Sequence, residues 1–308
     1  MESTLPQVAA TALINVSFAW IVGILASGFW LMRPATAWQR SVCGRLSAAM
    51  PAGLLLCLAG VFLSLWTESA LMGDVAWLDA WPVFVQMMTS THYGHAGVAA
   101  MALLAVAMLA HWILYRRATR PAYLAGIAAL LLLVAAARVT IGHAYQDGAL
   151  SVAAAMELLH LLCMALWTGI VFVAGWLVLP RMLDLEPART GETAAYLGSM
   201  SNWATAALTG ILATGAYNSY RVLDSARDLL EESYGQVLVL KLLLVLAAIA
   251  LGGFNRFLGL PAALSTRPAP AAQRGLAMVM TILRVESLVL LLVLLAAAVL
   301  TNNAPPGH

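Results

Sequence analysis

Residues 234–257, YGQVLVLKLLLVLAAIALGGFNRF, form a mainly apolar stretch in which Lys241 is the one charged residue before Arg256. A helix needs about 20 mainly apolar residues to cross the hydrocarbon core of a bilayer. Because this stretch has that length and almost no charge, it predicts a transmembrane helix.

Seven other stretches meet the same condition, namely residues 8–32, 42–66, 83–115, 121–142, 152–178, 195–220 and 276–300. Of the 308 residues, 62% are hydrophobic and 10% are charged, whereas a soluble domain of this size needs more charge on its surface. We therefore expect an all-α polytopic membrane protein, an eight-helix transmembrane bundle. It would form a single domain over residues 1–308, with four-helix halves at 1–150 and 151–308. The third stretch exceeds the bilayer thickness, so we expect its outer end to project or to break near Gly94 and Gly97.

The distribution of basic residues predicts the orientation. The loops that follow the first, third, fifth and seventh stretches contain Arg33, Arg40, Arg45, Arg116, Arg117, Arg120, Arg181, Arg189, Arg256, Arg267 and Arg274. The termini and the other loops contain only Arg221 and Arg227. Since cytoplasmic loops carry an excess of Lys and Arg, both termini are expected on the periplasmic side of a bacterial inner membrane.

Four of the six histidines lie toward the predicted outer side. His92 and His95 are at the outer end of the third stretch, and His143 is at the outer end of the fourth. His160 is eight residues into the fifth stretch, or roughly 12 Å along a helix. An imidazole at that depth needs a partner, so it indicates a functional site. His111, near the cytoplasmic end, is expected to contact solvent or headgroups.

The neighbours of His160 suggest a metal. Met156, His160 and Met164 follow at i, i+4 and i+8 on one helical face, and Glu157 lies on its flank. Imidazole with thioether suits Cu(I), whereas imidazole with carboxylate tolerates Cu(II). The candidate metal ligands are therefore His92, His95, His143, His160, Met156, Glu157 and Met164. Cu(I) is favoured, although any single methionine in a membrane helix is more often a packing residue than a ligand.

Two intramembrane carboxylates have two interpretations. Glu157 or Glu286 could relay protons in a coupled transporter, or could pair with Lys241 or Arg284. Pairing is the interpretation we favour, because buried charges are usually compensated.

Several motifs together resemble the copper resistance protein D (CopD) family over nearly the whole chain. They are residues 160–169 (HLLCMALWTG), 209–215, 234–241 with Asn255 and Arg256, 283–286 (LRVE), 91–95 (THYGH) and 142–144 (GHA). One departure is Ile170, which follows Gly169 where the family often has a second glycine. The resemblance implies an eight-helix inner-membrane protein that moves copper, which we expect to be import from periplasm to cytoplasm. It also implies His92, His95, His143 and His160 as copper-handling residues and a periplasmic CopC-like partner.

Other functions remain open on the sequence alone. The histidines on membrane helices could hold b-type haem for electron transfer, since His95 and His143 could supply an outer pair. A copper sensor or assembly protein would need similar ligands without transport. No GxxxxGK[ST] phosphate-binding motif occurs. We expect neither an enzyme nor a nucleic-acid partner.

Overall fold

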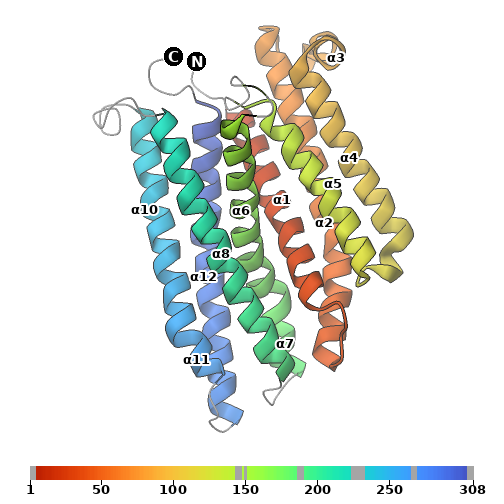
Figure 1. Cartoon of the computed structure of the whole chain (residues 1–308). Helices are drawn as coiled ribbons and strands as arrows, with labels where there is room; N and C mark the ends of the chain where they lie inside the picture. Colours follow the sequence, from red (N-terminus) through yellow and green to blue (C-terminus); the bar gives the residue numbers. More distant parts are fainter. Residues whose placement is uncertain are drawn as a thin grey trace.

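The fold is a bundle of long helices that run side by side (Figure 1). The computed structural model describes residues 5–142, 148, 151–185, 191–222, 233–264 and 269–303, and all regular structure in them is helical. The long helices are α1 (Leu5–Trp30), α2 (Ala37–Met72), α4 (His92–Leu114), α5 (Pro121–Val139), α6 (Val152–Val173), α8 (Gly191–Val222), α10 (Ser233–Phe254) and α12 (Ala269–Thr301). The short elements are η1 (Trp77–Asp79), α3 (Trp81–Ser90), η2 (Tyr115–Arg117), α7 (Leu179–Leu185), α11 (Leu260–Ala263) and two π-helical turns, η4 (Ala174–Val178) and η5 (Asn255–Gly259).

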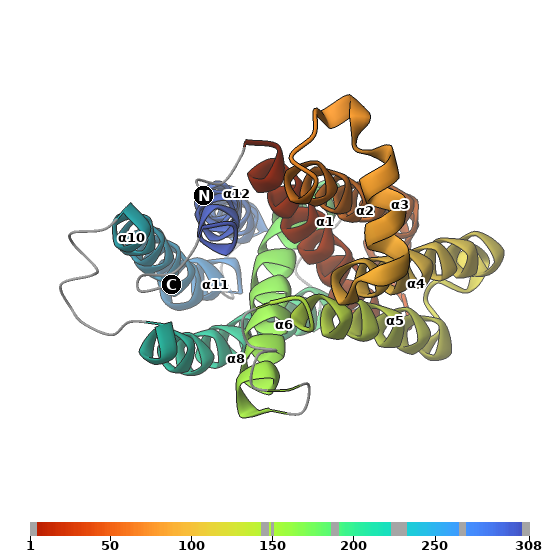
Figure 2. The same ribbon diagram turned by 90° about the horizontal axis from the view of Figure 1, so that it is seen from above.

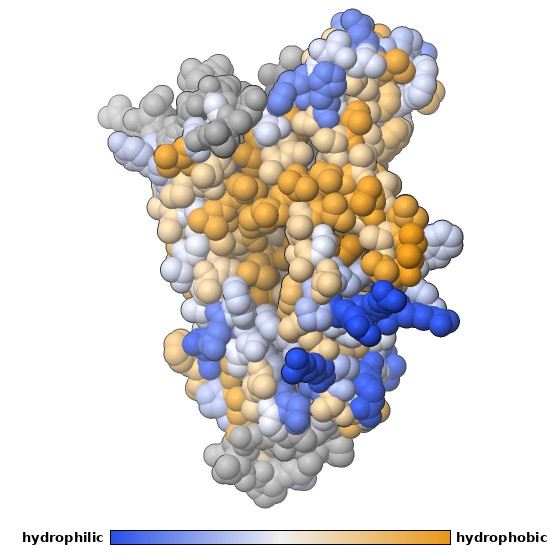
Figure 3. Space-filling view, turned by 45° about the vertical axis from the view of Figure 1, so that its right-hand side comes forward, coloured by the Kyte–Doolittle hydropathy of each residue, from blue (hydrophilic) through white to orange (hydrophobic). Residues whose placement is uncertain are grey.

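The length and hydropathy of the helices confirm the prediction of a multi-pass membrane protein. Within the described ranges, seven segments are long and apolar enough to cross a bilayer. They are Leu5–Trp30, Ala37–Met72, His92–Arg117, Pro121–Val139, Val152–Leu185, Tyr234–Ala263 and Pro270–Thr301. In the face seen in Figure 3, a hydrophobic band separates two more hydrophilic ends. Helix α8 has 32 residues but is not among the seven, because Ser, Thr, Asn and Gly interrupt its apolar sequence.

The third predicted helix is broken close to the glycines near which we expected a break. Helix α3 ends at Ser90, Thr91 is extended (φ −114°, ψ 149°), and α4 begins at His92. The Thr91 hydroxyl caps α4 by accepting from the Gly94 amide at 3.0 Å. A Cβ atom at Gly94 would overlap the Met87 carbonyl, so this glycine permits the turn rather than forming it. Consequently α3 lies at the end of the bundle where α4 begins (Figures 1 and 2).

Helix α6 lies at the centre of the bundle when it is viewed along the helices (Figure 2). It packs against α1, α5, α8 and α12. The closest approach is to α1, where a Cβ atom on Gly169 would overlap the Ala19 carbonyl and one on Gly23 would overlap Gly169. Such small residues let membrane helices approach closely. Different faces of α6 therefore pack against different helices.

The two ends of the described chain lie on the same side of the bundle. Asn302, which follows α12, donates its side-chain N–H to the Thr11 hydroxyl of α1 at 3.0 Å. Leu5 begins α1 only six residues before Thr11. The first helix thus begins where the last helix ends.

Candidate functional site

Helix α6 carries four of the seven predicted ligands. It begins after Ser151, whose hydroxyl accepts from the Ala154 amide at 3.1 Å and caps the helix. Met156, Glu157 and His160 are half-buried, whereas Met164 is 8% exposed and belongs to the hydrophobic core. The helical spacing that predicted one face for Met156, His160 and Met164 is therefore realised in a regular helix.

His160 is held by Thr214 of α8. Its Nδ1 atom lies 2.9 Å from the Thr214 Oγ1 atom. The Thr214 hydroxyl donates its own proton to the Gly210 carbonyl at 2.6 Å, so the oxygen accepts from His160. A neutral imidazole that donates from Nδ1 keeps a lone pair on Nε2. Within the described chain no hydrogen bond reaches that Nε2 atom, which leaves it available to a metal ion.

Glu157 lies one helical turn toward the outer end and is held by the same neighbour. Asn218 donates its side-chain N–H to the Glu157 carboxylate at 2.8 Å. Lys241 of α10 and Arg138 of α5 interact electrostatically with this carboxylate, and Lys241 also interacts with His160. The favoured pairing of Lys241 with Glu157 is therefore not seen as an ion pair among the described residues; their charges interact at longer range, and Asn218 supplies the direct contact.

Sequence reasoning missed Thr214 and Asn218. Together with Gly210 they follow at i, i+4 and i+8 along α8, and each faces α6. Gly210 packs against Cys163, and Gly215 lies beside the His160 ring. Polar and small residues at helical spacing in an otherwise apolar segment are the signal that could have identified them. The same residues lower the hydropathy of α8.

The outer histidines make separate contacts. His92 and His95 begin α4 and are both exposed. The His92 Nε2 atom lies 3.2 Å from the Thr140 carbonyl beyond α5, and the His95 Nε2 atom lies 3.1 Å from the Thr89 carbonyl of α3. His143 lies outside the described residues, so its predicted role has no structural account. Helix α5 packs against both α4 and α6, which makes the helices that carry these histidines neighbours.

The described residues do not gather three metal-binding side chains of the His, Cys, Asp or Glu type at one place. The structure brings His160 and Glu157 together on α6 with Thr214 and Asn218, and it leaves His92 and His95 at the outer rim. Met156 and Met164, each four residues from His160 on the same face of α6, carry the thioether groups nearest to it along this helix.

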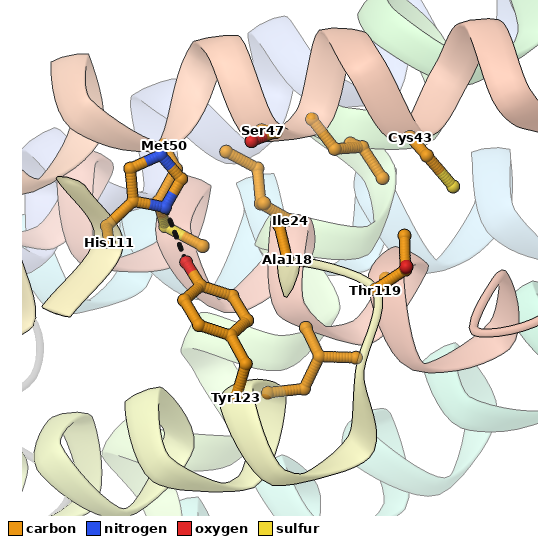
Figure 4. Close-up of a pocket in the computed structure, with 11 residues that line it drawn as sticks. Ile24, Cys43, Ser47, Met50, His111, Ala118, Thr119 and Tyr123 are labelled. Atoms are coloured by element: carbon orange, nitrogen blue, oxygen red, sulfur yellow. Dashed lines mark hydrogen bonds between the residues drawn. The ribbon is translucent and has the colours of Figure 1, made fainter. Parts of the chain in front are cut away.

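His111 differs from the expectation of a solvated interfacial residue. It is 4% exposed, and its Nδ1 atom accepts from the Tyr123 hydroxyl (Figure 4). Both side chains line a small, mostly apolar cavity of about 20 Å³ between α1, α2, α4 and α5. Because burial leaves its ring bonded to protein rather than to headgroups, His111 fastens the α4–α5 connection to the bundle.

Arg284 and Glu286 do not form the pair that the sequence suggested. The Arg284 guanidinium lies over the Trp176 ring at 4.8 Å, and its Nε–H donates to the Gly175 carbonyl at 3.2 Å. Glu286 is 1% exposed and accepts instead from the Trp167 indole. The two side chains are two positions apart on α12 and therefore point to different sides of the helix.

Comparison with known proteins gives one family. Residues 194–300 match the family model described as CopD, copper resistance protein D. The matched region includes Thr214, Asn218, Lys241 and Glu286, whereas His92, His95 and His160 precede it. No curated protein and no solved structure shows a significant match to the chain. The chain is thus a multi-pass membrane protein whose residues 194–300 match the model of the copper resistance protein D family, the family that its sequence motifs resemble.

Proposed function

We propose that the protein carries copper across the bacterial inner membrane, from periplasm to cytoplasm. The observation that supports this most strongly is the fixed state of His160, whose Nδ1–H is bonded to Thr214 and whose Nε2 lone pair is available. A ligating histidine usually donates its other ring N–H to a neighbouring acceptor, which fixes the tautomer and raises ligand basicity.

Copper would be transported as Cu(I). The Nε2 atom of His160 with a thioether from Met156 or Met164 gives the soft ligand set that this ion prefers. Glu157 would offset the positive charge at the same level, because Asn218 already holds its carboxylate beside α8. Lys241 and Arg138 oppose any strong retention of a cation nearby, which suits a site that must release its cargo.

Capture would take place at the outer rim. His92, His95 and His143 would receive copper from the periplasm, and a CopC-like periplasmic protein is the partner that the family resemblance suggests. The exposure of His92 and His95 at the start of α4 is compatible with this role. The neighbouring positions of α4, α5 and α6 give a short route to His160.

The proposed topology has eight crossings, all within one transmembrane domain, and both termini in the periplasm. The start of α1 beside the end of α12 supports an even number of crossings. Seven segments qualify by hydropathy, and α8 supplies the eighth with its polar face turned to α6. The positive-inside rule then places the arginine-rich connections in the cytoplasm.

The test is copper binding and flux with matched variants. The full chain, purified in detergent and loaded with Cu(I) under reducing conditions, should retain copper, and His160→Ala should lose it. Vesicles that contain the wild-type protein should accumulate copper, and those with His160→Ala should not. His111→Gln serves as the control, because His111 is bonded to Tyr123 away from the transport face. Retained copper without flux would indicate a sensor, and stoichiometric iron with a Soret band would indicate a cytochrome.

A further inference from the structure

Glu286 lies in the contact region of three helices. It is on α12, accepts from the Trp167 indole of α6, and faces Gly252 of α10, where a Cβ atom would come within 3.4 Å of its Oε1 atom. The side chain is 1% exposed. Trp167 is seven residues after His160 on α6, or roughly 10 Å along the helix. Glu286 is therefore the next carboxyl group inward from the proposed copper site.

No cation compensates Glu286 within the described part of the chain. Arg284, on the same helix, is bonded to Gly175 and lies over Trp176. On α10, Lys241 is eleven residues before Gly252 and interacts with Glu157 and His160. Each of these two cations has partners other than Glu286.

The other helices around α12 supply no compensating charge either. Helix α1 has no ionisable side chain in Leu5–Trp30, and α11 has none in Leu260–Ala263. The remaining titratable or charged groups on α12 and on the elements that pack against it contact residues other than Glu286. These contacts are Arg256 with Ser201 and Thr205, Arg181 with Asp184, Arg274 with the Pro270 carbonyl, Tyr234 with the charge of Glu157, and Cys163 with Gly210. Within the described ranges, the polar partner of Glu286 is thus the neutral indole of Trp167.

An ionised carboxylate in the membrane interior is costly unless a cation compensates it, so a carboxyl in these surroundings is stable in its neutral form. We propose that Glu286 is a proton-binding site that exchanges its proton for copper. When the cation moves along α6 past His160, the Glu286 O–H bond breaks, the carboxylate remains beside the cation, and the proton passes to water, which carries it out of the bundle. One positive charge enters the bundle interior as another leaves it, so the exchange is electroneutral. The coupling to copper rests on the proposed function, whereas the proton site does not.

The proton site is tested by infrared spectroscopy on the full-length protein. A protonated carboxylic acid has a carbonyl stretching band that a carboxylate lacks. The wild type at neutral pH should show such a band, and Glu286→Gln should lack it. Trp167→Phe, which removes the indole donor, should keep the band but shift it to higher frequency because the hydrogen bond is lost. Glu192→Gln, at the start of α8, is the control and should leave the band unchanged. A wild-type spectrum without any band that Glu286→Gln removes would overturn the proposal.

The exchange is tested in vesicles that contain a pH-sensitive dye. Addition of Cu(I) to the outside should release protons from the protein and change the pH that the internal dye reports, in proportion to the copper that enters. Glu286→Gln should abolish this change in internal pH. Copper entry without proton release in the wild type, or proton release that persists in Glu286→Gln, would overturn the exchange. Wild-type vesicles without copper uptake would contradict the proposed transport function, and the infrared result would still decide the proton site.

Discussion

Thr214→Val is the substitution that most directly tests the proposed role of His160. Valine has nearly the shape of threonine but no hydroxyl, so the His160 Nδ1–H loses the acceptor that now lies 2.9 Å away. The tautomer with a free Nε2 is then no longer fixed. Loss of such an outer-shell partner typically weakens metal binding by about 10- to 100-fold. This corresponds to about 1.4 to 2.8 kcal/mol of binding free energy.

The measurement is a competition titration of the purified protein against a Cu(I) chelator of known affinity. Thr214→Ser keeps the hydroxyl and should bind copper as the wild type does. Thr209→Val is the matched control, because the exposed Thr209 hydroxyl bonds only the Thr205 carbonyl of its own helix. If Thr214→Val binds Cu(I) as tightly as the wild type, the assignment of His160 Nε2 as a ligand held by Thr214 is wrong.

Two further substitutions test the packing. Gly169→Ala places a Cβ atom against the Ala19 carbonyl and should lower the thermal stability of the detergent-purified protein. Gly126→Ala is the control, because the space around Gly126 is open, and it should be neutral or slightly stabilising by about 0.5–1 kcal/mol. Equal melting temperatures for the two variants would contradict the close α1–α6 crossing. Tyr123→Phe leaves the buried His111 without its donor and should cost about 1–3 kcal/mol of stability without changing copper affinity. Tyr115→Phe, at an exposed position, is the control, and a loss of copper binding in Tyr123→Phe would assign His111 to the site.

The prediction of the membrane fold was largely correct because hydrophobic length is a local property. The helices around residues 8–32 and 121–142, for example, occur as Leu5–Trp30 and Pro121–Val139. The third stretch was predicted to project or to break near Gly94 and Gly97, and the chain turns at Thr91, three residues before Gly94. The position of such a turn depends on which backbone groups can be capped. In this case the Thr91 hydroxyl decides it, with Gly94 providing the space.

The candidate site was predicted only in part. The periodicity of α6 identified Glu157 and His160 as unusual at their depth, since their cost in a bilayer follows from residue type and position alone. It could not identify Thr214 or Asn218, which are 54 and 61 residues further along the chain. The sequence also suggested headgroup contact for His111 and an Arg284–Glu286 pair. In the structure His111 is bonded to Tyr123 instead, Arg284 lies over Trp176, and Glu286 accepts from Trp167.

The sequence by itself determined that this chain is an all-helical membrane protein and which ionisable groups lie within its apolar segments. A helix satisfies its own backbone in lipid, so a sufficiently long apolar segment needs no knowledge of its neighbours to be recognised. The tertiary structure alone decided that His160 donates to Thr214, that Asn218 holds Glu157, and that no cation among the described residues pairs with Glu286. These contacts depend on the rotation and order of the helices, which small residues such as Gly23 and Gly169 fix through close packing rather than through hydropathy.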